Sequence, residues 1–405
     1  MTRSLFLTRA LAGAAMLAGA VVSAGAQQDQ QSEFQSQQIP GWVFTPGIIA
    51  SSVYDNNVGL AATFPTQPET AGDSLFVVEP YGQLEYNGPR TNFESGYRGY
   101  LRRYLDFDQL NGFDQHGYGS LRYRATRRLT LFMRDTFLDV PTTDELQLNG
   151  VPFTRTGSRN NVLTAGFESR LSRYTDLNVR YENNWVDFDK NTVTGTLLRN
   201  GYINAVTVNM DRRVGDRSAL GGEYAIRLAN LDGGARQLTF QDVGATFRYD
   251  TGPNTTFDAA AGVSYLIDRT LDANRTGPYV RAGITHRAQR ATLGADYARE
   301  FVPTFGFGGS IQSQSVRGYV RMPLSRNRLY VQESVSWRRS DPFVATELGL
   351  DSFWLHSTVG YSMSRWLRLE GFYAYTRQDS RVAGGLINRH RIGAQVVIAQ
   401  PVRLQ

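Results

Sequence analysis

Strict alternation of apolar and polar residues constrains the fold of this chain more than any other feature. It is clearest between Asn161 and Trp185, where two alternating arms flank a short polar segment. The apolar residues of the two arms are Leu163, Ala165, Phe167, Leu177, Val179 and Tyr181. A period of two is typical of a β-strand with one apolar and one polar face. The segment therefore predicts a β-hairpin.

The same pattern recurs from Trp42 to the end of the chain, and we expect about 18 strands. Each segment is close to the roughly 9–11 residues that a tilted strand needs to cross a bilayer. After residue 26 the sequence has neither a long apolar run nor a segment with helical periodicity. The pattern predicts an all-β protein, a transmembrane antiparallel up-and-down β-barrel.

The segments between these strands alternate in length. Short ones include 87–90, 172–175 and 250–254, whereas 55–74, 139–160 and 187–201 are long. Short periplasmic turns on one rim and long extracellular loops on the other are typical of outer-membrane barrels. An even number of strands would place both termini on the periplasmic side.

The N-terminal residues have the pattern of a secretory signal. Arg3 and Arg9 precede an apolar run that is too short to span a bilayer, and Ala24-Gly25-Ala26 fits a signal-peptidase site. We expect a signal peptide over 1–26, a flexible periplasmic segment over 27–41 and the barrel over 42–405. The expected location is the bacterial outer membrane.

Aromatic residues gather near the ends of the predicted strands, which is typical of the girdles at the two bilayer interfaces. They are Tyr54, Tyr86, Tyr104, Phe137, Tyr174, Trp185, Tyr249, Tyr265, Trp337, Trp366 and Tyr375. Ordinary β-propensity is the alternative explanation. The girdle interpretation makes outer-membrane lipid and lipopolysaccharide the expected surroundings.

The residues out of phase with the apolar face are mostly charged, and a barrel would turn them toward its lumen. The predicted lumen-lining residues are Arg98, Arg122, Arg124, Arg134, Arg170, Arg180, Glu182, Arg248, Arg281, Arg317, Arg321, Arg368, Glu370 and Arg391. They would line a wet channel or brace a closed interior. The excess of arginine favours anionic or sugar-like passengers.

Two acidic residues do not fit the separation into an apolar outer face and a charged inner face. Asp135 and Glu333 fall in phase with the lipid-facing side of their strands. A charge near the bilayer midplane costs about 2–4 kcal/mol for arginine or lysine and less for an acid. We therefore expect a bulge, an interfacial depth or a different register at these two positions.

Other classes of function find little support in the sequence. The chain has no cysteine, and its four histidines are scattered without H-E-x-x-H spacing. It also lacks a G-x-S-x-G motif. The net charge of +6 includes no basic run with interleaved aromatic residues. We expect no enzyme, no metal, no cofactor and no nucleic-acid partner.

The segments 47–60 and 74–86 begin the alternating region with Tyr54, Asp55, Asn56 and Asn57, followed by the Val-Glu-Pro at 78–80. This opening resembles the putative β-barrel porin 2 family of Gram-negative outer membranes. The resemblance implies a porin-type barrel, and for some similar proteins a role in exopolysaccharide export with a periplasmic partner. For residues 54–57 themselves we favour turn formation, because Asp and Asn start the first long loop.

Three hypotheses follow. The first is a porin-type channel for polar solutes or a polysaccharide. The second is a non-conducting barrel, closed by Arg–Glu bracing or by an inserted loop such as 146–158. This barrel would act in exopolysaccharide export or envelope assembly, with a periplasmic polysaccharide-export protein as partner. The third is a soluble periplasmic β protein. The sequence carries no signature of a trimer face, so the oligomeric state stays open.

Overall fold

The computed structural model describes residues 40–62, 70–189, 198–288, 290–306, 309–324, 328–343, 349–380 and 385–404. The predicted signal peptide at 1–26 and nearly all of the segment 27–41 lie outside these residues. No helix within the described ranges is long and apolar enough to cross a membrane.

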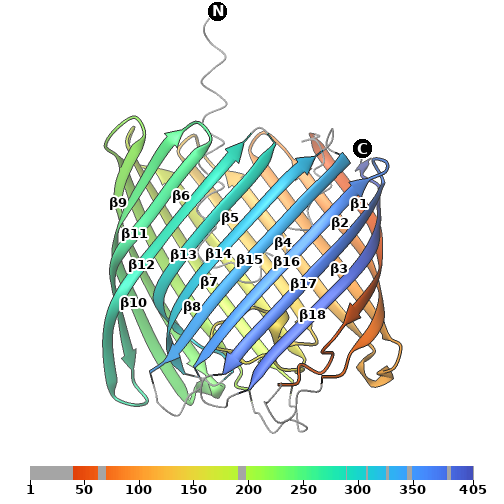
Figure 1. Ribbon diagram of the computed structural model, residues 1–405. Coiled ribbons are helices and arrows are strands. Elements are labelled where there is room, and N and C mark those ends of the chain that lie inside the picture. The colour runs from red at the N-terminus through yellow and green to blue at the C-terminus, as the bar shows by residue number, and fades with distance from the viewer. Residues whose placement is uncertain are drawn as a thin grey trace, which may run out of the picture.

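The chain forms a single closed antiparallel barrel in which each strand pairs with its neighbours in sequence (Figure 1). The strands are β1 (Gly41–Asp55), β2 (Asp73–Asn87), β3 (Thr91–Tyr104), β4 (Gly112–Arg124), β5 (Leu129–Val140), β6 (Ser158–Arg170), β7 (Thr175–Phe188), β8 (Gly201–Arg213), β9 (Ser218–Leu231), β10 (Arg236–Gly252), β11 (Thr255–Asp268), β12 (Ala273–Ala288), β13 (Ala291–Pro303), β14 (Ser310–Leu324), β15 (Leu329–Pro342), β16 (Leu350–Ser362), β17 (Leu367–Ser380), β18 (Leu386–Ala399) and β19 (Val402–Leu404). The predicted up-and-down barrel is confirmed.

The first and last strands close the barrel. Strand β1 pairs with β18 over Gly47–Asp55 and with β19 over Trp42–Phe44. Pro401 separates β18 from β19, because proline has no N–H to donate to the ladder. Since β19 continues the edge formed by β18, the wall has 18 strand positions, which matches the predicted number.

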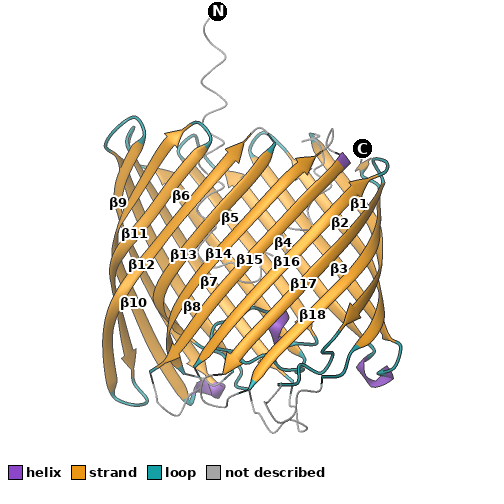
Figure 2. Ribbon diagram, viewed as in Figure 1, coloured by secondary structure: helices purple, strands orange, loops and turns teal. Residues whose placement is uncertain are grey.

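The two rims differ as predicted (Figure 2). Connections such as 88–90 and 171–174 are short turns on one rim, where β1 begins and the C-terminus lies. Two short 3-10 helices, η1 (Asp108–Leu110) and η3 (Asp232–Gly234), lie at the other rim among the described residues, and η2 (Thr143–Glu145) lies inside this end of the barrel. Two connections on this second rim, 232–235 and 269–272, are as short as the turns.

The outward face of the wall is apolar around the barrel. Exposed residues on this face include Leu131, Val206, Val243, Val335 and Ile392. A soluble monomer rarely exposes so continuous an apolar surface, whereas bilayer hydrocarbon requires one. The chain is thus a transmembrane barrel.

Several of the predicted girdle aromatics are strongly exposed, among them Tyr54, Tyr174, Trp185 and Trp366. Tyr104 is an exception, and its assignment to a girdle was wrong. It lies on the inner face of β3, is 5% exposed and packs with Val53 and Leu75. The sequence places it at a strand end, but only the register shows which way it points.

Asp135 and Glu333 keep the outward phase of their strands, and no register shift occurs beside them. Each carboxylate instead accepts a hydrogen bond from the adjacent strand: Asn161 Nδ2 donates to Asp135 over 3.0 Å, and Ser357 Oγ donates to Glu333. The expected bulge or altered register is therefore wrong. On the outer wall, a hydrogen bond from a neighbouring donor thus offsets part of the cost of placing each carboxylate there.

Candidate functional site

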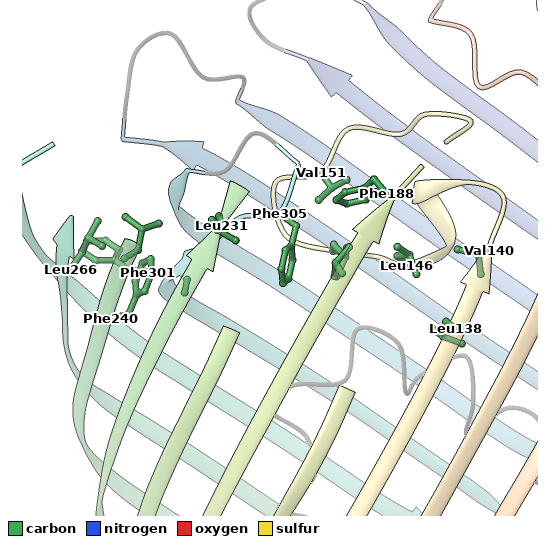
Figure 3. Close-up of a cluster of buried hydrophobic side chains, with 14 residues drawn as sticks. Leu138, Val140, Leu146, Val151, Phe188, Leu231, Phe240, Leu266, Phe301 and Phe305 are labelled. Atoms are coloured by element: carbon green, nitrogen blue, oxygen red, sulfur yellow. The ribbon is translucent and has the colours of Figure 1, made fainter. Parts of the chain in front are cut away.

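The connection between β5 and β6, residues 141–157, enters the barrel, and we call it the lumen loop (Figure 3). An external loop of this length would expose its apolar side chains. Here Leu146 is 1% exposed and Val151 3%. Both lie inside the wall, where they pack against apolar residues at the loop-side ends of the strands.

One apolar cluster holds the lumen loop against the strands beside it. Leu146, Leu148 and Val151 of the loop share this cluster with wall residues. The wall residues shown in Figure 3 include Leu138, Val140, Phe188, Leu231, Phe240, Leu266 and Phe301. Burial of a leucine side chain stabilises a fold by about 1.5–3 kcal/mol, so the cluster anchors the loop strongly.

The loop turns sharply at Gly150, whose φ is +62°. A Cβ at this position would lie 2.5 Å from Thr304 Cγ2, on the connection that follows β13. Only glycine combines the left-handed conformation with so close an approach.

Polar contacts continue across the lumen to strands β14 to β18. Trp354 Nε1 on β16 donates to the Asp144 carbonyl over 3.2 Å. On β17, the Gln378 side chain bonds both Phe153 N, over 2.7 Å, and the Val151 carbonyl, over 3.1 Å. The loop thus bridges opposite parts of the wall and narrows the passage between them.

A buried charge cluster fastens the loop to the barrel seam. Arg389 on β18 donates to Asp55 on β1 through Nε (2.8 Å) and Nη2 (2.6 Å), and its Nη1 donates to Asp144 of the lumen loop (3.0 and 3.1 Å). The side chains of all three are at most 3% exposed. We call Asp55, Asp144 and Arg389 the seam triad.

Burial alone would raise the pKa of Asp144, but Arg389 and Arg391 outweigh it and hold this pKa below its ordinary value. Asp144 is therefore a carboxylate at neutral pH. Next to it, Glu145 forms a second, more exposed ion pair with Arg391 at 2.8 Å.

The motif Tyr54–Asn57 now has a structural explanation. Tyr54 points outward, whereas Asp55 belongs to the seam triad. Asn56 Oδ1 accepts from the His390 backbone N–H over 2.6 Å, and Asn57 Nδ2 donates to the Asn388 carbonyl over 3.0 Å. The expected turn is present, since Asn57 N donates to Asp55 Oδ1 over 3.0 Å. The motif also joins the first strand to the last.

The strand registers place the predicted lumen residues on the inner face, in phase with Asp55 and Arg389. These residues are Arg98, Arg122, Arg124, Arg134, Arg170, Arg180, Glu182, Arg248, Arg281, Arg317, Arg321, Arg368, Glu370 and Arg391. Several pair locally: Arg98 with Glu79 at 3.1 Å, Arg122 with Glu168 at 2.5 Å, and Arg368 with Glu370.

A second ionic network braces the wall from β9 to β13. Glu300 accepts from Arg227 Nη1 over 3.2 Å and from Arg281 Nη2 over 3.0 Å. Arg227 also bonds Asp242, and Arg281 bonds Glu223 at 3.2 Å. Arg281 on β12 is thus held by acids on β9 and β13.

Sequence reasoning missed Asp144, Arg389, Glu300 and Arg338 as site residues. The partners in the seam triad are 245 and 334 positions apart, so no local spacing connects them. The alternation could have placed Arg389 on the same face as Arg391, which was predicted. Among the described residues no cluster of His, Cys, Asp and Glu could hold a metal ion.

No known family profile matches the chain, and no curated protein does. Solved structures do match. OccAB4 of Acinetobacter baumannii aligns over 90% of this chain and 99% of its own, with 11% identity and a TM-score of 0.47. OpdK of Pseudomonas aeruginosa, solved with vanillate, covers 88% and 99% with 10% identity and a TM-score of 0.43. OccK3 (OpdO) of P. aeruginosa covers 88% and 96% with 10% identity and a TM-score of 0.45.

Proposed function

We propose that this protein is an outer-membrane channel of the porin type that passes small polar solutes, with a preference for anions. The observation that carries the proposal is the combination of an apolar outer wall with an arginine-rich inner wall crossed by the lumen loop. An apolar exterior suits lipid, and an interior of charged side chains suits water and polar passengers.

The lumen loop supports a small passenger over a polymer. It contacts β14 to β18 through hydrogen bonds and the seam triad, and a cluster of apolar residues fixes its other side. A loop anchored on both sides leaves a constricted path. Passage of a polysaccharide chain would require this loop to leave the lumen.

The second candidate is a non-conducting barrel that assists exopolysaccharide export. The ionic brace around Glu300 and the buried lumen loop favour it, because both fill the interior. Membership of the porin 2 family suits either candidate, because the resemblance implies a porin-type barrel, whereas a periplasmic polysaccharide-export partner belongs to this second candidate. They rest on the resemblance of Tyr54–Asn57 and of the segment that follows.

A liposome-swelling assay separates the two candidates. Purified full-length protein is reconstituted, and influx is measured for solutes of increasing size and for gluconate against choline. We expect rapid influx of small solutes, a sharp size limit and faster entry of the anion. Liposomes that carry heat-modifiable, folded protein and yet stay osmotically tight would favour the non-conducting barrel.

A further inference from the structure

Arg338, on the inner face of β15, is a buried cation without an acidic partner in the described part of the chain. It is 6% exposed, its Nη1 donates to the Gln147 carbonyl of the lumen loop over 2.5 Å, and its guanidinium lies 5.5 Å from the centre of the Trp354 ring. By contrast, Arg389 and Arg281 both bond carboxylates. Burying an unpaired charge is costly, so a missing counter-charge calls for an explanation.

The donors around Arg338 are also unfilled. Arg338 Nε and Ser336 Oγ are both buried, and neither has a hydrogen-bond partner among the residues that the structure describes. Ser336 precedes Arg338 by two positions on the same face of β15, and Arg317 on β14 lies directly opposite Ser336. Two arginines and a free hydroxyl therefore occupy neighbouring positions beside the lumen loop.

Within the described ranges, no nearby acid is left over to supply the counter-charge. The acid that interacts electrostatically with Arg338 is Glu300. Its carboxylate already accepts from Arg227 and Arg281. The lumen loop offers Arg338 only a backbone carbonyl.

We propose that Arg338 and Ser336 form an anion-binding site in the constriction and that a small carboxylate is its ligand. Nε and Nη2 make up the edge of the guanidinium that Gln147 leaves free, and a planar carboxylate matches such an edge with two parallel hydrogen bonds. The Ser336 hydroxyl adds a donor, and the Trp354 ring provides an apolar wall. The site rests on the proposed function, since it names the class of passenger that would be held beside the lumen loop.

Trp354 makes the site measurable, because a bound bromide quenches a nearby indole. In the full-length protein the other tryptophans (Trp42, Trp185, Trp337 and Trp366) are changed to Phe, and the folded protein is titrated with bromide in detergent micelles at constant ionic strength. We expect quenching that saturates, and acetate that competes with bromide and restores the emission. Arg338→Gln should leave only linear, collisional quenching, and Arg338→Lys should weaken binding by about tenfold.

Arg339→Gln is the matched control, because Arg339 follows Arg338 directly but points outward and pairs with Asp341 at 3.1 Å. It should bind bromide as the parent does.

Linear quenching in the parent protein would overturn the site whatever the variants do, and saturable quenching that acetate fails to reverse would overturn the carboxylate assignment. The titration needs no solute flux. A protein that binds bromide but does not conduct would refute the channel alone, and one that conducts but shows linear quenching would refute the site alone.

Discussion

At the scale of single residues, the seam triad connects the lumen loop to the closure of the barrel. One guanidinium serves two buried carboxylates that come from the first strand and from the loop. Such an arrangement is sensitive to the loss of its centre, because two charges would remain buried without a partner.

Replacement of Arg389 by Met should therefore destabilise the protein by about 3–5 kcal/mol, the usual effect of removing one partner from a buried ion pair. Arg170→Met is the control, since the side chains of Arg170 and Asp176 form an ion pair that is about half exposed, at 54% and 50%. Its effect should be about 1 kcal/mol or less. Midpoints of denaturant unfolding in micelles compare the variants, and equal midpoints would contradict the proposed role of the triad.

Protonation of Asp144 should weaken its contact with Arg389. Because the pKa of Asp144 is lowered in the folded protein, its ionic anchor contributes fully above the unfolded value of about 3.9 and is lost as pH falls through the folded value. Hydrogen exchange across 141–157, corrected for intrinsic rates, should show constant protection from pH 8 to about 5 and a loss only in strong acid. Asp144→Asn should remove this pH dependence, and a loss of protection near pH 6 would exclude Asp144 as its cause.

At the scale of elements, the lumen loop determines the width of the passage. Leu146→Asp should detach it, because a carboxylate would enter the apolar cluster around Leu146, where the native leucine is 1% exposed. We expect a larger size limit for solutes in the swelling assay. Leu271→Asp, at a leucine that is 50% exposed on the same rim, should leave the limit unchanged. Identical limits for the two variants would show that the loop does not constrict the path.

The strands could be predicted from the sequence because their alternation is local. The segments around Leu163 and Val179 fix both the element and its outward face. The position of the lumen loop could not be predicted in the same way. Its apolar residues Leu146, Leu148 and Val151 indicate burial, and insertion was one of two ways suggested to close the lumen, but the partners on β14 to β18 lie far away in sequence.

The same limit applies to the candidate site. Phase along a strand identified Arg281 and Arg391 as inward-facing. It could not identify which arginines are neutralised, since that depends on contacts such as Arg281 with Glu300 on the next strand. Likewise, Arg338 lacks an acidic partner among the described residues, and this follows from the assembled wall rather than from its phase along β15.

At the scale of the whole molecule, the two faces of the barrel wall meet different environments. The outer face contacts lipid, and the inner face contacts the polar lumen. Adjacent residues of β7 test this division, because Val179 points outward and Asn178 inward toward Glu168. Val179→Arg should weaken folding into lipid vesicles by about 2–4 kcal/mol, whereas Asn178→Arg should have a small effect. Denaturant titration in vesicles measures both, and equal effects would mean that the two faces do not differ in environment.

The most direct test of the channel is the single-channel conductance of the purified full-length protein in planar bilayers under a salt gradient. We predict discrete steps and a reversal potential that shows anion preference. This preference should fall when Arg122 and Arg180, both on the inner face, are changed together to Gln. A silent bilayer from protein that is folded and heat-modifiable would contradict the channel and leave the non-conducting barrel.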